Sequence, residues 1–250
     1  MSETSSSVTV PGWAQGRTGR GQGGFSSALF EAAIGQQVSI GLRAPIPLET
    51  ELTVHETDSR WELRHGDVVI MTATPRVGLS DEDTDRSATD PVTIADAARA
   101  RSRFPVSADT HNAPHCLSCG FGERTMQVWP GLVDDPSGRQ RVASDWIPPA
   151  WAGSDDGLVR PPFVWMALDC TCGFFVGHHP ERRNAVTVQY AVDILVPLRV
   201  GRPYAVVGYD GTWPGGWEGR KRGASSCVFD DTGRLVALAN SFWVSVPDGQ

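Results

Sequence analysis

The sequence predicts an α+β fold in which one unit, a helix followed by several strands, occurs twice. The first observation is a pair of similar apolar segments, 23–35 and 161–173. Each has phenylalanine at its third position, an acid at its ninth and glycine at its thirteenth. The second observation is that strand-like segments follow each of them. Because the matches keep the same order along the chain, they indicate an internal duplication.

Two further matches support the duplication outside the helices. Ile46-Pro47-Leu48 corresponds to Val196-Pro197-Leu198, and the segment 66–69 corresponds to 233–236. The offset between the copies grows from 138 to 150 to 167 residues. The second unit must therefore contain insertions relative to the first.

Composition limits the classes of function. The chain has 250 residues, of which 40% are hydrophobic and 20% charged, as in an ordinary globular protein. A net charge of −7 argues against nucleic acid or an anionic membrane as the main partner. No apolar run reaches the roughly 18–20 residues of a membrane span. Five cysteines without a disulfide framework, and a Ser/Thr-rich start without signal-peptide order, predict a cytoplasmic protein with reduced thiols.

The first unit is expected over residues 1–78. Its helix spans 25–34, with Ser26 or Ser27 as the cap and Gly35 at the C-terminal left-handed position. A tight turn at 65–67 connects two of the strands. The predicted strands are 8–10, 38–44, 51–57, 60–64 and 68–74.

Residues 79–108 are expected to form the linker, with an acidic loop at 79–91 and a short surface helix at 93–104. The second unit follows over 109–250, with a helix predicted at 163–172. Its predicted strands are a hairpin of 125–129 with 140–146, and then 186–194, 203–209, 223–229 and 235–246.

One acid lies inside each apolar helix, Glu31 in the first and Asp169 in the second. A carboxylate is costly to bury unless other groups compensate it. Both acids are therefore candidate functional residues, with a structural acid as the alternative for each.

Two motifs resemble the hotdog fold of the thioesterase-like superfamily. The first is Gly23-Gly24 at a helix start, with Glu31 seven residues after the second glycine; Gln22 stands where the family has histidine. The second is His115-Cys116-Leu117-Ser118-Cys119-Gly120 followed by 126–129, which is similar to a cysteine-containing lead-in of such proteins. The resemblance covers most of the chain except the linker.

The resemblance implies a double hotdog: two tandem units, each a curved antiparallel sheet wrapped on a central helix, paired within the chain as a pseudo-dimer. Pairing removes an open sheet edge from each unit. Whether the pair assembles into a further homo-oligomer stays open. The implied partner is an acyl-CoA or a similar acyl thioester, with no nucleic acid and no membrane.

In the family, the acid of one unit works with a backbone N–H at the helix start of the other. Asp169 would then face Gly23 and Gly24, whereas Glu31 would face residues 161 and 162, which are prolines without an amide hydrogen. The expected site is Asp169 with the two glycines, and Glu31 is retained as the second catalytic candidate. The other expected substrate-binding residues are Phe25, Trp165, Arg182 and Arg183.

Two functions remain open at this stage, with a third, weaker alternative of an interaction protein whose cysteines bind zinc. One is hydrolysis of an acyl-CoA thioester at one competent site, and the other is non-catalytic binding of an acyl group or CoA. No nucleophile elbow, P-loop or dinucleotide fingerprint is present.

Cys116 and Cys119 resemble half of a zinc site, but Cys170 and Cys172, which could supply the other half, point to different faces of a helix. We therefore expect buried thiols, no metal and no cofactor.

Overall fold

The computed structural model describes residues 6–76, 90–178, 184–211 and 218–246. Within these residues eleven strands form one antiparallel sheet in the order β1-β3-β4-β5-β2-β8-β11-β10-β9-β7-β6. The strands are β1 (Ser7–Thr9), β2 (Val38–Leu42), β3 (Glu51–Glu56), β4 (Trp61–His65), β5 (Val68–Pro75), β6 (Gly131–Leu132), β7 (Val142–Trp146), β8 (Ala185–Ile194), β9 (Tyr204–Asp210), β10 (Lys221–Phe229) and β11 (Leu235–Ser245). The helices are α1 (Gly23–Ile34), α2 (Ile94–Arg101), α3 (Pro161–Gly177) and a 3-10 turn at Ala150–Ala152.

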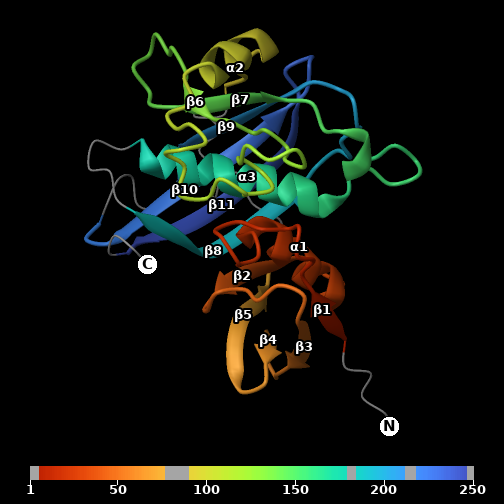
Figure 1. Ribbon diagram of the computed structural model, residues 1–250. Coiled ribbons are helices and arrows are strands. Elements are labelled where there is room, and N and C mark those ends of the chain that lie inside the picture. The colour runs from red at the N-terminus through yellow and green to blue at the C-terminus, as the bar shows by residue number, and fades with distance from the viewer. Residues whose placement is uncertain (1–5, 77–89, 179–183, 212–217, 247–250) are drawn as a thin grey trace.

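The sheet divides at the pair β2–β8. Every strand on the β2 side precedes residue 76, and every strand on the β8 side follows residue 130. The contact between them is short, with only Ile40 opposite Tyr190 and Gly41 opposite Gln189. Figure 1 shows this division, with β3, β4 and β5 at the lower end and the long strands β8 to β11 above them.

Helices cover both faces of the sheet. α1 and α3 pack against one face, where Phe30, Leu168 and Val206 belong to the main core cluster. α2 covers the opposite face through Ala97 and Ala100. Residues 205 and 207 pack on the α2 side while residue 206 packs on the α1/α3 side, as the alternation of a β-strand requires.

The start of α1 differs from the sequence prediction. The helix begins at Gly23, so Ser26 and Ser27 lie inside it and neither is the cap. Gln22 is the cap, with its side-chain Oε1 accepting a hydrogen bond from Phe25 N at 2.6 Å. The predicted end is confirmed, because Gly35 has φ +81° and its N–H bonds to Glu31 O.

The second central helix is longer than predicted. α3 starts at Pro161 rather than at residue 163 and continues to Gly177. Proline is compatible with the first helical positions, where the amides have no intrahelical partner. The helix therefore begins at the two prolines, two residues before Phe163.

The predicted hairpin partner at 125–129 is wrong. The N–H groups of Met126 and Val128 bond to the carbonyls of Leu117 and Ser118, and Gln127 has φ +52°. A left-handed residue in the middle of the segment prevents a regular strand. The strand that pairs with β7 is instead β6.

The predicted surface helix in the 79–108 segment is confirmed as α2. Thr93 is its cap, with Oγ1 accepting from Asp96 N at 3.1 Å. The acidic segment predicted at 79–91 falls mainly outside the described residues. No helix of the described residues is long and apolar enough to cross a membrane.

A first prediction concerns the contact between the two central helices. A Cβ atom on Gly24 would lie 2.7 Å from Trp165 O and 2.9 Å from Met166 Cα. Both are backbone atoms of α3, so Gly24→Ala should push the helices apart and lower the free energy of unfolding by about 1–3 kcal/mol. Urea denaturation followed by circular dichroism measures this.

Gly177→Ala is the matched control, because Gly177 is also helical but a Cβ there meets nothing within 4 Å. This substitution should leave stability unchanged or raise it by up to about 1 kcal/mol. Equal effects of the two substitutions would show that the α1–α3 distance at Gly24 does not limit stability.

Candidate functional site

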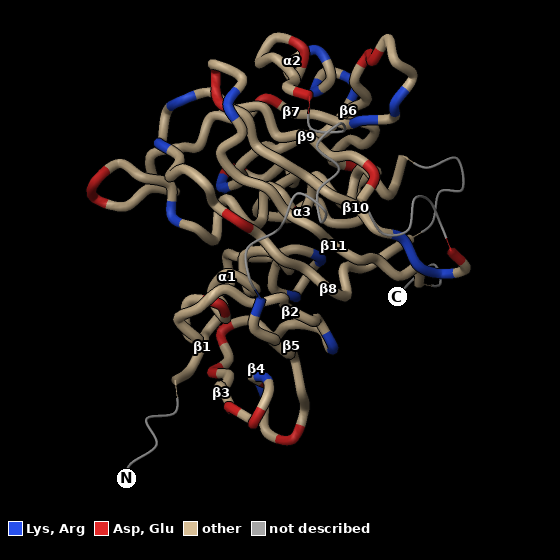
Figure 2. Tube along the Cα trace, turned by 180° about the vertical axis from the view of Figure 1, so that it is seen from behind, with Lys and Arg blue, Asp and Glu red and all other residues tan. Residues whose placement is uncertain are grey.

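The two central helices each contain one charged residue, Glu31 in α1 and Asp169 in α3. In Figure 2 the charged segments lie mostly on the loops around these helices, whose own paths are largely uncharged. Each acid is therefore the single charged residue of its helix. The structure gives them different surroundings.

Asp169 faces the start of α1, and three donors surround its carboxylate. Oδ2 accepts from Gln22 Nε2 at 2.7 Å and from Gly24 N at 3.1 Å, while Oδ1 accepts from Thr187 Oγ1 at 3.0 Å. The side chain is only 5% exposed. Burial raises the pKa of Asp169 to about 6, because the cost of desolvating the charge exceeds the stabilisation that these donors give.

The two carboxylate oxygens of Asp169 are not equivalent. Oδ2 already accepts two hydrogen bonds, whereas Oδ1 accepts one among the described residues. A carboxylate oxygen offers about two acceptor positions, so Oδ1 retains one. This oxygen can accept a proton from a ligand or a water molecule.

The two glycines at the start of α1 have different tasks. Gly24 allows α3 to approach and gives its N–H to Asp169, and it does not line the cavity described below. Gly23 does line that cavity, and its N–H has no hydrogen-bond partner within the described segments. Of the two amides expected to face a ligand, only that of Gly23 is available.

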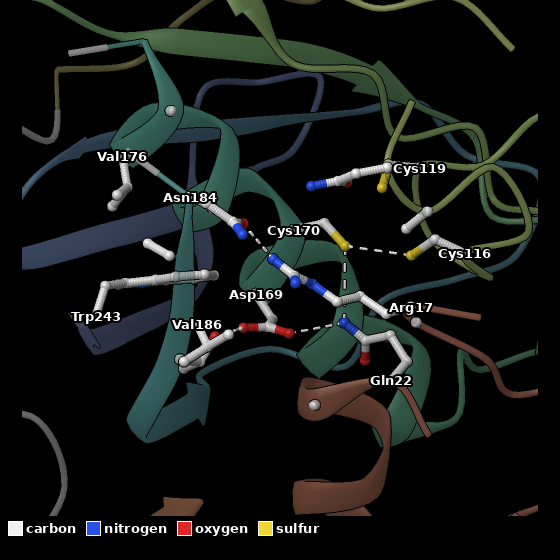
Figure 3. A pocket seen from close by; sticks show the side chains of 18 of the residues that line it. Arg17, Gln22, Cys116, Cys119, Asp169, Cys170, Val176, Asn184, Val186 and Trp243 are labelled. Atoms are coloured by element: carbon white, nitrogen blue, oxygen red, sulfur yellow. Dashed lines mark hydrogen bonds between the residues drawn. The ribbon is translucent and has the colours of Figure 1, made fainter. Parts of the chain in front are cut away.

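A cavity of about 800 Å³ opens beside Asp169. It is lined by the basic residues Arg17, Arg20 and Arg43, by apolar residues that include Leu42, Val186 and Trp243, and by the thiols of Cys116, Cys119 and Cys170. Figure 3 shows Asp169, Gln22 and Cys170 next to one another on its wall, with Asn184 bonded to Arg17 at 2.5 Å. The cavity is large enough for a drug-sized ligand and mixes apolar with cationic walls.

Glu31 lies outside this cavity lining. Its carboxylate accepts a hydrogen bond from Val38 N at 3.1 Å, which links the end of α1 to the first residue of β2. Burial is the main cause that raises its pKa. The buried Arg76–Asp193 ion pair, at 2.7 Å, contributes smaller and opposing effects. Glu31 thus has a structural partner and does not line the cavity beside Asp169.

The two aromatic residues expected to bind substrate lie in the core. Phe25 packs edge-on against Trp13 and Phe163, each with ring centroids 5.4 Å apart. Trp165 packs against Tyr190, whose hydroxyl donates to the Trp165 carbonyl at 2.7 Å. Neither aromatic residue lines the cavity. Arg182 and Arg183 fall outside the described residues.

Sequence reasoning missed two residues that hold Asp169. Gln22 carried a signal, because it precedes Gly23-Gly24 at the position where the resembled family has histidine, but its bond to Asp169 was not foreseen. Thr187 carried none, since it sits on a strand and reaches Asp169 only through the packing of α3 on the sheet.

Three of the five cysteines lie together beside the site. Cys116 Sγ lies 3.7 Å from Cys170 Sγ, and all three sulfur atoms of Cys116, Cys119 and Cys170 lie within 4.8 Å of one another. Hydrogen bonds from the two neighbouring thiols lower the pKa of Cys116. The predicted divergence of the helical thiols is confirmed, since Cys172 Sγ donates to Ser226 Oγ on β10 at 3.2 Å. Burial raises the pKa of Cys172 to about 12.

Several solved structures are similar to this chain. A tesB protein of Mycobacterium avium subspecies paratuberculosis aligns with 96% of this chain and 92% of its own, at 13% identity and a TM-score of 0.59. Zebra fish thioesterase superfamily member 2 aligns with 62% of this chain and 99% of its own, at 8% identity and a TM-score of 0.44. A putative thioesterase from Ralstonia eutropha aligns with 46% and 83% of the two chains, at 15% identity and a TM-score of 0.39.

The similarity to the tesB protein extends over nearly the whole chain and confirms the resemblance in fold to hotdog proteins of the thioesterase superfamily. At such low identity the likeness concerns fold alone. No family model matches the sequence, and no curated protein matches it significantly.

A second prediction tests the role of Gln22 as a link between the helices. Gln22→Ala removes both the cap of α1 and a hydrogen bond to a buried carboxylate, and should lower the free energy of unfolding by about 1–3 kcal/mol. Gln189→Ala is the control, because the Gln189 amide makes one exposed bond, to Ser39 Oγ. Its effect should stay within about 0.5 kcal/mol. Thermal and urea unfolding compare the two, and similar losses would remove Gln22 from this role.

Proposed function

We propose that the protein hydrolyses an acyl thioester at Asp169. The observation that supports this most is that Asp169 and Gly23 line one cavity, and that among the described residues the Gly23 N–H has no hydrogen-bond partner and Asp169 Oδ1 accepts only one bond. A base and an oxyanion donor are the two groups that acyl transfer requires.

Each group has a distinct part in the proposed reaction. The Gly23 N–H, at the positive end of α1, donates to the thioester carbonyl oxygen and stabilises the negative charge that develops there. In the general-base route, Asp169 Oδ1 takes a proton from a water molecule that attacks the carbonyl carbon; the C–S bond then breaks, and the thiolate leaves as a thiol with that proton, which frees the carboxylic acid. In the nucleophilic route, Oδ1 attacks the carbon and expels the thiolate, and water hydrolyses the resulting mixed anhydride. Gln22 and Thr187, which also line the cavity, hold the carboxylate in place through their hydrogen bonds to Oδ2 and Oδ1.

The proposed substrate class is an acyl-CoA. Arg17, Arg20 and Arg43 on the cavity wall supply cations suited to phosphate groups, and the apolar wall suits an acyl chain. The fold shared with the tesB protein agrees with this class. Arg182 and Arg183 remain candidates for the same phosphates.

The proposed architecture is a double hotdog, with a first unit at 1–78, a linker at 79–108 and a second unit at 109–250. The division of the sheet at β2–β8 and the face-to-face packing of α1 and α3 support it. Such a chain has two equivalent places for a site. Among the described residues, the place with Asp169 combines an acid at the cavity with a glycine amide that has no partner, whereas Pro161 and Pro162 at the start of α3 have no N–H to offer the other place.

A binding protein without turnover is the second candidate. The observation that favours it is the saturation of Asp169 Oδ2 by Gln22 and Gly24, which makes the carboxylate well suited to a structural role. Such a protein would bind acyl-CoA in the same cavity and release it unchanged.

A third prediction separates these candidates. Asp169→Asn should lower kcat/KM for acyl-CoA hydrolysis by about 10²–10⁴, the usual contribution of a positioned base. Glu31→Gln, the same change in the other central helix, should leave it within a few-fold. A thiol-release assay over a panel of chain lengths measures both. If Asp169→Asn and the wild-type protein hydrolyse acyl-CoA at the same rate and both bind it, the result would support the binding protein.

A fourth prediction removes the proposed oxyanion donor. Gly23→Pro deletes the N–H at the start of α1. The preceding residue, Gln22, has φ −70° and ψ 129°, close to the φ −63° and ψ 135° of Arg160, which precedes Pro161 in α3. The chain itself thus shows that proline fits after this backbone geometry. The variant should lose about 10²–10³ in kcat.

Gly23→Ala is the matched control, since it adds a Cβ beside Asp169 Oδ2, 3.2 Å away, yet keeps the N–H. Its kcat should stay well above that of Gly23→Pro. If alanine and proline reduce kcat equally, the effect is steric and the amide has no catalytic role.

A further inference from the structure

Two separate segments bring three thiols to one point on the cavity wall. Cys116 and Cys119 come from the loop before Gly120, and Cys170 comes from α3, 51 residues after Cys119. Figure 3 shows their sulfur atoms directed toward one another above Gln22. Such convergence of thiols from distant segments is typical of a soft-metal site.

The spacing of the sulfur atoms fits a tetrahedral zinc site. With Zn–S bonds of about 2.3 Å, two thiolates of a tetrahedron lie about 3.8 Å apart. Cys116 Sγ and Cys170 Sγ are 3.7 Å apart, and Cys119 Sγ is within 4.8 Å of both. A disulfide would require a separation of about 2.05 Å between two of them and would leave the third unused.

The loop that carries Cys116 and Cys119 is held rigidly. Gly120 N bonds to Cys116 O at 2.8 Å, and Leu117 N bonds to Gln15 O at 2.8 Å. A Cβ on Gly120 would lie 2.5 Å from Cys116 O, so the turn requires glycine there. The two loop thiols are therefore preorganised before α3 adds the third.

We propose that Cys116, Cys119 and Cys170 bind one Zn²⁺ ion beside the Asp169 cavity. Binding releases the thiol protons to solvent, and the ion joins the cysteine loop to α3. Cys170 lines the cavity and is partly exposed, which gives the ion a route of entry.

Three thiolates fill three positions of a tetrahedral ion, and because all three cysteines line the cavity, the fourth position is left for a ligand from the cavity. Within the described segments, no further His, Cys, Asp or Glu ligand atom joins the group of three. His111 lines the same cavity, but its Nδ1 accepts a hydrogen bond from Ala113 N at 2.8 Å, so a neutral ring carries its proton on Nε2 and cannot ligate through that atom. A water molecule or a thiol-containing ligand can take the open position.

This proposal does not depend on thioester hydrolysis, so its test measures metal rather than turnover. The full chain, purified under reducing conditions and stripped with a chelator, is titrated with Zn²⁺ against a competing chromophoric chelator. We expect about one Zn²⁺ per chain, and substitution by Co²⁺ should give thiolate-to-cobalt charge-transfer bands. Absence of stoichiometric Zn²⁺ binding would overturn the site.

Variants locate the ion within the chain. Cys116→Ser, Cys119→Ser and Cys170→Ser should each abolish stoichiometric binding. Cys227→Ser is the matched control, because Cys227 is a fully buried thiol that lies outside the cluster. A loss in Cys227→Ser as large as that in Cys116→Ser would contradict the assignment.

If the cysteine variants fail to fold, a measurement on the wild-type chain still tests the site. Alkylation followed by peptide mass spectrometry should show that Zn²⁺ protects Cys116, Cys119 and Cys170 and leaves the rate at Cys172 and Cys227 unchanged. Equal rates with and without Zn²⁺ at the three cysteines would overturn the proposal. Recovery of a Cys116–Cys170 disulfide from reduced protein saturated with Zn²⁺ would overturn it as well.

Discussion

The burial of the Asp169 carboxylate between α1 and α3 is the constraint on which the rest of the site depends. A buried charge requires hydrogen-bond donors in fixed positions. Gln22 and Gly24 supply them from the start of α1, and Thr187 supplies one from β8. The close approach of the helices is possible because Gly24 has no side chain. The contact that packs the core is thus the contact that positions the acid.

The starts of α1 and α3 have the same backbone geometry but differ in the amides that they can offer. The residues that precede them, Gln22 and Arg160, have nearly the same dihedral angles. Two glycines then leave amides that can donate, whereas two prolines leave none. The same geometry therefore provides donors at α1 and only a stiff entry at α3. The difference between Glu31, which bonds to Val38, and Asp169, at the cavity, follows the same asymmetry.

The sequence was sufficient for most elements that depend on local pattern. Apolar helices, β-branched segments and glycine turns such as Gly35 and Gly66 act over a few residues, so they are visible in the chain. The features that it did not reveal depend on distant partners. The strand expected at 125–129 is lost because its amides bond to the cysteine loop. Thr187 and the Cys116–Cys170 contact require the packing of α3, which no short window contains.

The cap of α1 was mispredicted for a related reason. Serine is a common cap, and Ser26 and Ser27 were the nearest candidates, but the cap is Gln22, which also bonds to Asp169 and lies four residues before Ser26. A tertiary contact decided a local boundary. Phe25 and Trp165 likewise looked available for a ligand, but packing placed both in the core.

The short seam between β2 and β8 has a consequence for synthesis on the ribosome. Strand β2 is complete at Leu42, yet its partner β8 begins only at Ala185. During the intervening translation, the edge of β2 has no partner strand on that side, and the start of α1 has no α3 to pack against. An open edge of this kind invites contact with other chains. The N-terminal half of each nascent chain therefore exposes an unpaired strand edge until β8 has been made.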